Sequence, residues 1–139
     1  MFPQCNTQVK TAARLVVCAS PNVHTTPILA QLHWLPLQAC ISYKITCFCF
    51  SSINFSTPAY LSHILHLYSH ARPLRSNADT RLLKLPLYKH KTKGGCAFSH
   101  FGPSVWKWNS LPSHIRNAAA ITTFKSVLKT HFFSLYHSD

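Results

Sequence analysis

The stretch TFKSVLKTHFFSLY, residues 123–136, carries the clearest structural pattern in this chain of 139 residues. Its apolar side chains recur every three or four residues, which is the spacing of one face of an α-helix. The residues on that face are Phe124, Val127, Leu128, His131, Phe132 and Leu135. Lys125 and Lys129 stand on its flank, so we expect an amphipathic helix here.

A second amphipathic helix is expected near the beginning of the chain, over residues 6–18. Lys10 and Arg14 lie one turn apart beside an apolar face, which repeats the placement of cations in the last helix. A short helix follows. Thr26 is expected to cap it, Pro27 to take its first position and Pro36 to end it.

Two segments in the middle of the chain carry helical signals. Residues 39–53 fit either a helix or a buried strand, because the stripe Ile41, Ile45, Phe48 and Ser52 suits a helix while the run ITCFCF is β-branched and aromatic. Thr57-Pro58 repeats the start signal and opens a further predicted helix. Its apolar stripe consists of Leu61, Ile64, Leu65 and Tyr68, and its opposite stripe consists of His63, His66 and His70. A short turn is expected to end at Arg116.

The composition changes at Arg72, where half of the fourteen lysines and arginines gather within 22 residues. These seven cations, here called the basic tract, are Arg72, Arg75, Arg81, Lys84, Lys89, Lys91 and Lys93. Two prolines and the pair Gly94-Gly95 disfavour a helix, so we expect a loop and a small two-stranded β-ribbon near residues 82–100. Alternate lysines of an extended strand project to one side about 6.5–7 Å apart, which suits a phosphate backbone.

Trp106 and Trp108 follow the basic tract. Exposed aromatic rings stack on bases in proteins that bind single strands, so both tryptophans are candidate stacking platforms. The alternative is that each ring belongs to the core, which is the more common place for a tryptophan.

The chain carries a formal net charge of +12, because fourteen cations face only Asp79 and Asp139. Such a surplus attracts polyanions, either nucleic acid or an acidic membrane surface. Ten histidines should strengthen this attraction as the pH falls toward about 6.5. The two acids are far apart, which excludes the clustered carboxylates of two-metal phosphoryl transfer, glycoside hydrolysis and EF-hand calcium sites.

The cysteines and histidines do not predict a metal or catalytic site. Cys47 and Cys49 are spaced too tightly for a zinc ligand pair, and Cys96 with His100 lacks a second pair. The histidine stripe is more typical of a solvated helix face than of a metal site. No G-x-S-x-G or comparable nucleophile motif is present. We therefore expect no cofactor, no metal, no small-molecule substrate and no catalytic residue.

The sequence also bears on location. Residues 15–43 and 45–71 lack charged side chains, but prolines and polar residues interrupt both, so membrane-spanning helices are not expected. The apolar run after Arg14 is too short for the core of a signal peptide. We expect a nuclear or cytoplasmic protein, neither secreted nor transmembrane, whose six cysteines are reduced.

Short motifs occur in a definite order along nearly the whole chain. They are AARLV (12–16), HTTPIL (24–29), LHWLP (32–36), PAYLS (58–62), RPLRS (72–76), AFS (97–99), GP (102–103) and WNSLP (108–112). In this order they resemble the C-terminal region of the reverse-transcriptase polyprotein of vertebrate LINE-type (non-long-terminal-repeat, jockey-like) retrotransposons, downstream of the polymerase core. The chain departs from the family pattern at Ser51, at Phe55 and in residues 105–109, which are two residues longer than usual.

The resemblance implies a non-catalytic tail. In such elements an upstream endonuclease nicks DNA and an upstream polymerase copies the RNA, and no catalytic residue of either enzyme matches a position here. The tail is expected to help hold template RNA or target DNA. It is also expected to pack loosely, because relatives fold this region against a polymerase. Two alternatives remain open: a decayed open reading frame without selected activity, and a basic protein that only interacts with partners or with a membrane surface.

We thus expect an α+β, mostly helical chain that forms a single region, 1–139. A helical part covers 1–71, the basic loop and β-ribbon cover 72–101, and an aromatic turn with the last helix covers 102–139. The expected partner is RNA or single-stranded DNA, bound without sequence preference by the basic tract together with Trp106 and Trp108.

Overall fold

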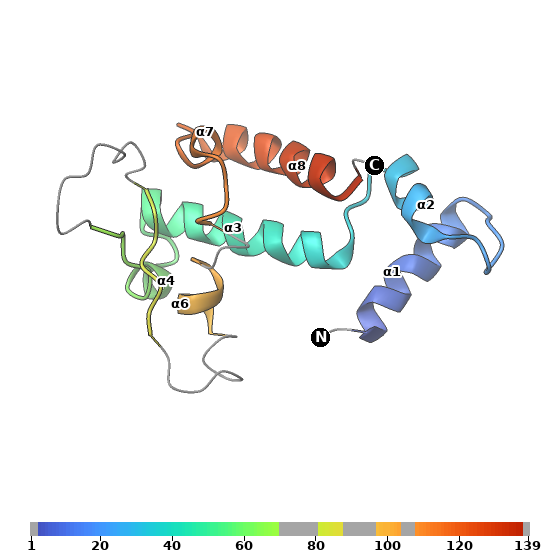
Figure 1. The fold of residues 1–139 in the computed structure, drawn as a ribbon, viewed down its shortest axis with the longest axis horizontal. Coiled ribbons are helices and arrows are strands. Elements are labelled where there is room, and N and C mark those ends of the chain that lie inside the picture. The colour runs from blue at the N-terminus through green and yellow to red at the C-terminus, as the bar shows by residue number, and fades with distance from the viewer. Residues whose placement is uncertain (1–2, 70–80, 88–96, 104–107, 138–139) are drawn as a thin grey trace. The chain divides into compact units, whose positions relative to one another are not determined.

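The computed structural model describes residues 3–69, 81–87, 97–103 and 108–137 of the chain. Seven helices follow one another along these residues (Figure 1). They are α1 (Pro3–Val16), α2 (Thr25–Gln31), α3 (Leu37–Phe55), α4 (Ala59–Ser62), α6 (Phe98–Phe101), α7 (Ser113–Arg116) and α8 (Ile121–His137). The predicted mostly helical class is confirmed. No helix in this part of the chain is long and apolar enough to cross a membrane.

Contacts divide the chain into two compact units. Unit 1 consists of Met1–Tyr43 and Leu128–Asp139, and unit 2 consists of Lys44–Val127. The boundaries fall inside α3 and α8 and do not follow the divisions that composition suggested, after residues 71 and 101. Composition marks where charge changes along the chain, whereas packing brings the first and last segments together in unit 1.

The two amphipathic helices predicted at the ends of the chain are present as α1 and α8. Ala13 of α1 is buried against Ile28 and Leu29 of α2, with Val9 packed beside them. The side chain of Arg14 donates to the backbone oxygen of Val23 at 3.0 Å, which ties the loop between α1 and α2 to α1. These contacts form the small apolar core of unit 1.

The buried face of α8 is narrower than the sequence pattern suggested. Phe124 and Leu128 are fully buried and Phe132 nearly so, as expected. Leu135 was assigned to the same face, but 62% of its surface is exposed. The apolar stripe of the last helix therefore ends one turn earlier than predicted, and its final leucine faces solvent.

The ambiguous segment 39–53 is helical and lies within α3. Its buried positions are Ala39, Ser42, Thr46, Cys47, Cys49, Phe50 and Ser52. Except for Ser52, these residues are not the stripe of Ile41, Ile45, Phe48 and Ser52 that was read from the sequence, and Phe48 is 47% exposed. Small residues on the buried face let other segments approach the helix closely. Ser42 satisfies its hydroxyl by donating to the backbone oxygen of Gln38 at 2.9 Å.

An aromatic cluster forms the core of unit 2. The rings of Phe50 in α3 and Phe124 in α8 are stacked, with centroids 4.0 Å apart. The indole of Trp108 lies beside both rings, at 6.4 Å from Phe50 and 6.1 Å from Phe124. All three side chains have no exposed surface. Burial of three such rings contributes strongly to the apolar stabilisation of this unit.

The helix predicted after Thr57-Pro58 is much shorter than expected. Pro58 is the N-cap of α4, and the helix ends at Ser62. Beyond it Leu67 forms an antiparallel bridge with Leu83. The backbone nitrogen of Tyr68 donates to Leu82 and that of Lys84 donates to His66, both at 2.8 Å. Pairing with a distant segment replaces the helix here, so His63 and His66 do not share a helix face, and His70 lies outside the described residues.

The two-stranded ribbon expected near residues 82–100 is not seen in the described residues. Leu83 pairs with Leu67, which precedes the basic tract, and residues Phe98–Phe101 form the helical turn α6. Residues 88–96 lie outside the described part of the chain. The short turn predicted to end at Arg116 is present as α7.

Three helices end in residues with positive φ that are not glycine, Cys18, His33 and Ser56. After α1, the backbone nitrogen of Ala19 donates to Arg14 and that of Cys18 donates to Leu15. This pattern is the Schellman motif, in which a left-handed residue closes the helix. His33 closes α2 in the same way. That helix begins at Thr25 with His24 as its N-cap, two residues before the predicted start, so Thr26 is not the cap.

Gly102 follows α6 and lies very close to α3. A Cβ atom on Gly102 would stand 3.0 Å from the Sγ atom of Cys49 and 3.0 Å from the backbone oxygen of Phe98. The tight contact therefore favours glycine at this position, and it closes the surroundings of Cys49. Burial raises the pKa of the Cys49 thiol from its ordinary value of 9.0 to about 12, and the nearby Cys47 adds to the rise. The thiol is protonated at neutral pH.

Replacing the left-handed Cys18 should stabilise the chain. We expect Cys18→Gly to raise the free energy of unfolding by about 0.5–1 kcal/mol, because glycine adopts a positive φ without steric cost. Cys5→Gly is the matched control within α1 and should lower this free energy by up to about 0.5 kcal/mol, because glycine weakens a helix. Urea unfolding measures both, and equal shifts of the same sign would contradict the assignment of Cys18.

The Cys49 thiol should make stability depend on alkaline pH. Between pH 9 and about 12 only the unfolded state releases the thiol proton. The free energy of unfolding should then fall as pH rises, by at most about 1.4 kcal/mol per pH unit. Because other groups titrate in this range, the quantity to follow is the difference between the parent chain and Cys49→Ala, which should shrink above pH 9. Cys5→Ala is the control, and a constant difference for Cys49→Ala would show that Cys49 is not shielded.

Candidate nucleic-acid interface

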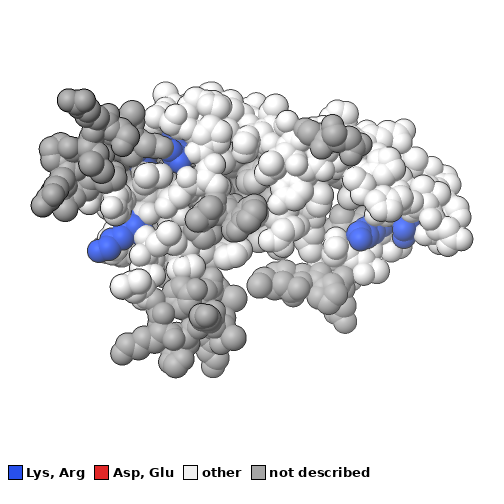
Figure 2. Space-filling model, viewed as in Figure 1, with Lys and Arg blue, Asp and Glu red and all other residues white. Residues whose placement is uncertain are grey.

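Every charged side chain among the described residues is positive, because Asp79 and Asp139 both lie outside them. Figure 2 shows Lys and Arg on one face of the molecule as small separate groups among uncharged residues. Two members of the basic tract, Arg81 and Lys84, are described. The other members, Arg72, Arg75, Lys89, Lys91 and Lys93, lie outside the described residues, as does Trp106.

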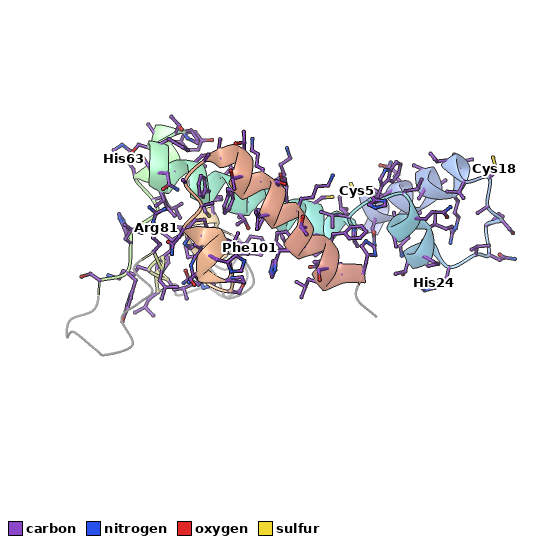
Figure 3. All side chains as sticks on the ribbon, turned by 90° about the horizontal axis from the view of Figure 1, so that it is seen from above. Cys5, Cys18, His24, His63, Arg81 and Phe101 are labelled. Carbon is purple, nitrogen blue, oxygen red and sulfur yellow. The ribbon has the colours of Figure 1, made fainter. Side chains whose placement is uncertain are left out.

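Arg81 is anchored to unit 2 by both its side chain and its backbone (labelled in Figure 3). Its NH1 group donates to the side-chain oxygen of Asn54 at 2.9 Å and more weakly to the backbone oxygen of Arg116 at 3.5 Å. Its own backbone oxygen accepts the Nε1 hydrogen of Trp108 at 2.6 Å. Arg81 is half-buried, so it contributes charge from a fixed position.

Leu83 is clamped along both edges of its backbone. On one edge Asn109 acts as a strand partner: its Oδ1 accepts from the Leu83 nitrogen and its Nδ2 donates to the Leu83 oxygen, both at 2.9 Å. The opposite edge of this segment pairs with residues 66–68. The Leu83 side chain is only 2% exposed. Residues 82–84 are therefore held in an extended conformation on the core of unit 2.

Lys84 follows this clamp directly and is exposed. Successive side chains of an extended segment point to opposite sides, so burial of Leu83 turns Lys84 outward. Leu85 and Leu87 are exposed as well, and Leu87 is fully so. The clamp thus presents the middle of the basic tract to solvent.

Trp108 corrects the prediction that both tryptophans are stacking platforms. The ring has no exposed surface and lies between Phe50 and Phe124, with its Nε1 hydrogen donated to Arg81. A buried ring offers no face to a base. Trp108 is therefore removed from the candidate interface, and its role is to fix the backbone at Arg81.

Arg116 and Asn109 were not singled out from the sequence. The guanidinium of Arg116 is 2% exposed and donates through NH1 to the backbone oxygen of Asn109 at 3.1 Å. It holds the segment that carries the clamp. From the sequence alone, Arg116 looks like one more surface cation in a cationic chain, so nothing indicated that it is buried. Asn109 lies within the WNSLP motif, and that motif was the one sequence signal that pointed to it.

A polar cavity of about 560 Å³ adjoins Leu83 within unit 2. Its lining includes the hydroxyl residues Ser52, Ser56 and Ser62 and the imidazoles of His63 and His66. The Ser52 hydroxyl is buried and has no hydrogen-bond partner in the described part of the chain. Hydroxyl and imidazole groups donate hydrogen bonds to phosphate oxygens, so this lining supplies uncharged donors next to Leu83.

The described residues contain no group of three histidine, cysteine or acidic side chains arranged to hold a metal ion. No disulfide joins the five cysteines among them. Comparison with known proteins adds no relative: no family model, no curated protein and no solved structure matches this chain.

The Asn109 clamp should be a measurable part of stability. Asn109→Ala removes two hydrogen bonds from the Leu83 backbone, and we expect the free energy of unfolding to fall by about 1–3 kcal/mol. Asn117→Ala, at an exposed position after α7, should change it by less than about 0.5 kcal/mol. Urea unfolding and amide hydrogen exchange at Leu83 test this. Unchanged exchange at Leu83 in Asn109→Ala would contradict the clamp.

Proposed function

We propose that this chain binds RNA or single-stranded DNA without sequence preference, through its basic tract. In this proposal it is a non-catalytic segment of the kind found at the C-terminal end of LINE-type reverse-transcriptase polyproteins. The proposed setting is the nucleus or the cytoplasm. The observation that carries the proposal is the clamp that holds residues 82–84 extended on unit 2 and leaves Lys84 exposed.

An ordered strand in the middle of a cationic tract favours binding to a phosphate backbone. Ordering a backbone costs conformational entropy. Residues 82–84 are already ordered in the folded chain, so binding does not have to order them. Leu83 bonds to Asn109 on one edge, and its neighbours bond to residues 66–68 on the other, so this position does not need to rearrange. Arg81 and Lys84 then lie on either side of the clamped residue Leu83.

Charge supports the same proposal. Each phosphate contact by a cation releases a counterion, and a chain with net charge +12 gains strongly from this effect. The described residues hold no carboxylate that would compete for Arg81 or Lys84. The serine and histidine donors of the polar cavity lie next to Leu83, where they could add uncharged contacts to phosphate or sugar.

The proposed role is binding alone. Phosphoryl transfer by paired metal ions requires clustered carboxylates, and the sequence contains only Asp79 and Asp139.

Salt dependence tests the proposal. For a single-stranded oligonucleotide, log K should fall linearly with log salt, with a slope that reflects the number of phosphate contacts. Lys84→Gln should reduce the slope by about 0.7, and the triple variant Lys89→Gln, Lys91→Gln, Lys93→Gln by up to about 2, at roughly 0.7 per lost contact. Fluorescence anisotropy at several salt concentrations measures this.

A second triple variant controls for charge alone. Lys10→Gln, Lys44→Gln, Lys125→Gln removes the same charge from α1, α3 and α8 and should leave the slope unchanged. Equal losses of slope in both triple variants would refute a localised interface. Absence of binding by the parent chain at low salt would favour a decayed reading frame without activity.

A further inference from the structure

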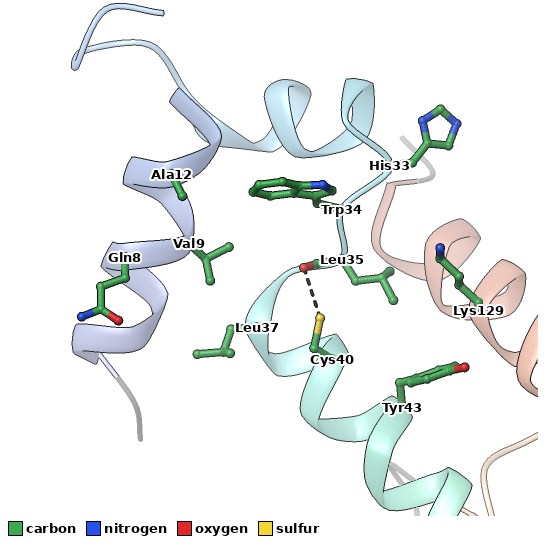
Figure 4. A pocket seen from close by; sticks show the side chains of 10 residues that line it. All are labelled: Gln8, Val9, Ala12, His33, Trp34, Leu35, Leu37, Cys40, Tyr43 and Lys129. Atoms are coloured by element: carbon green, nitrogen blue, oxygen red, sulfur yellow. Dashed lines mark hydrogen bonds between the residues drawn. The ribbon is translucent and has the colours of Figure 1, made fainter. Parts of the chain in front are cut away.

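Unit 1 contains a second cavity, of about 690 Å³, whose chemistry differs from that of the candidate interface (Figure 4). It opens between α1, the segment after α2, the beginning of α3 and Lys129 of α8. Val9, Leu35 and Leu37 provide apolar walls, and the indole of Trp34 lies along one side. Its volume falls within the range of about 300–1,000 Å³ that is typical of small-molecule sites.

Contacts with α8 and α1 hold the walls of this cavity together. The ring of His33 stacks on Phe133 of α8 with centroids 5.3 Å apart. The Nε2 atom of His137 donates to the backbone oxygen of Trp34 at 3.2 Å, in the tautomer that carries hydrogen on Nε2. On the other side, α1 is bound to α2 through the buried core around Ala13. The segment that carries Trp34 is therefore fixed to both α1 and α8.

The lining is apolar except at its edges. Cys40 is occupied by donation of its thiol to the backbone oxygen of Leu35 at 3.5 Å (dashed in Figure 4). Lys129 is the one charged side chain of the lining. Trp34 is 38% exposed, although an indole gains from burial. An apolar ligand would cover this ring and the neighbouring leucines.

We propose that this cavity binds an amphipathic monoanion, an apolar chain or ring that ends in a carboxylate. The apolar part would lie against Trp34, Leu35 and Leu37, and Lys129 would pair with the carboxylate at the rim. No described residue carries a carboxylate that could take this place. A phosphate backbone fits the cavity poorly, because its binding requires a row of cations and an apolar wall offers phosphate oxygens neither charge nor hydrogen-bond donors. The inference is independent of nucleic-acid binding.

Decanoate and its neutral analogue 1-decanol are suitable probes, since they differ only in the charged end. We expect decanoate, below its micelle-forming concentration, to change the fluorescence of the parent chain and to lose that effect in Trp34→Phe. Lys129→Met should weaken decanoate binding by about tenfold, as expected for one charge-assisted hydrogen bond, and leave 1-decanol unchanged. Lys125→Met, one turn earlier on α8, is the matched control and should change neither affinity by more than about twofold.

A variant that fills the cavity completes the test. Ala12 lines the wall formed by α1 and is exposed, so Ala12→Trp should block both probes without disturbing the core. Circular dichroism checks that the helices persist, and Lys129→Met keeps the test valid if Ala12→Trp does not fold. The proposal is overturned if decanoate binds Ala12→Trp normally, if Lys129→Met and Lys125→Met weaken it equally, or if binding appears only with micelles.

Discussion

The indole of Trp108 connects the core of unit 2 to the basic tract, and much of the unit depends on it. The ring packs against Phe50 and Phe124, so α3 and α8 meet around it. Its only polar atom, Nε1, donates to the backbone of Arg81 at 2.6 Å, and the adjacent Asn109 bonds to both backbone groups of Leu83. Apolar burial and backbone hydrogen bonding therefore act at consecutive residues. A segment rich in cations, which would otherwise repel itself, is held on the core by uncharged groups.

The scarcity of acids affects the interior as well as the surface. Arg116 is buried, and backbone oxygens of the segment that carries Trp108 and Asn109 accept its hydrogen bonds in place of a carboxylate. Arg81 likewise bonds to an amide oxygen, that of Asn54. Carbonyl dipoles accept hydrogen bonds from a guanidinium without cancelling its charge. The positive charges of Arg81 and Arg116 are therefore not neutralised where these side chains are anchored.

The sequence predictions succeeded and failed for identifiable reasons. Periodicity located α1 and α8 because their apolar residues recur every three or four positions. It misplaced the buried face of α3, whose inward positions are mostly small residues such as Ala39 and Ser42 that carry little hydropathy signal. It extended α4 to Tyr68 because Leu61, Ile64 and Leu65 keep helical spacing, whereas the chain leaves the helix to pair with residues 82–84. Of the candidate site, Lys84 is exposed and stays a prediction as a binding residue, while the Asn109 clamp was not foreseen.

The sequence alone determined the general character of the protein. It predicted a mostly helical chain with an amphipathic helix at each end, a cationic middle and almost no acidic residues. These properties depend on composition and on neighbours three or four residues apart, which a linear reading can detect. Only the tertiary structure decided that Trp108 is buried, that Leu67 meets Leu83, and that the first and last segments share unit 1. Each of these results joins residues distant along the chain. Their free energy comes from packing and hydrogen bonds that exist only after folding, so no local pattern encodes them.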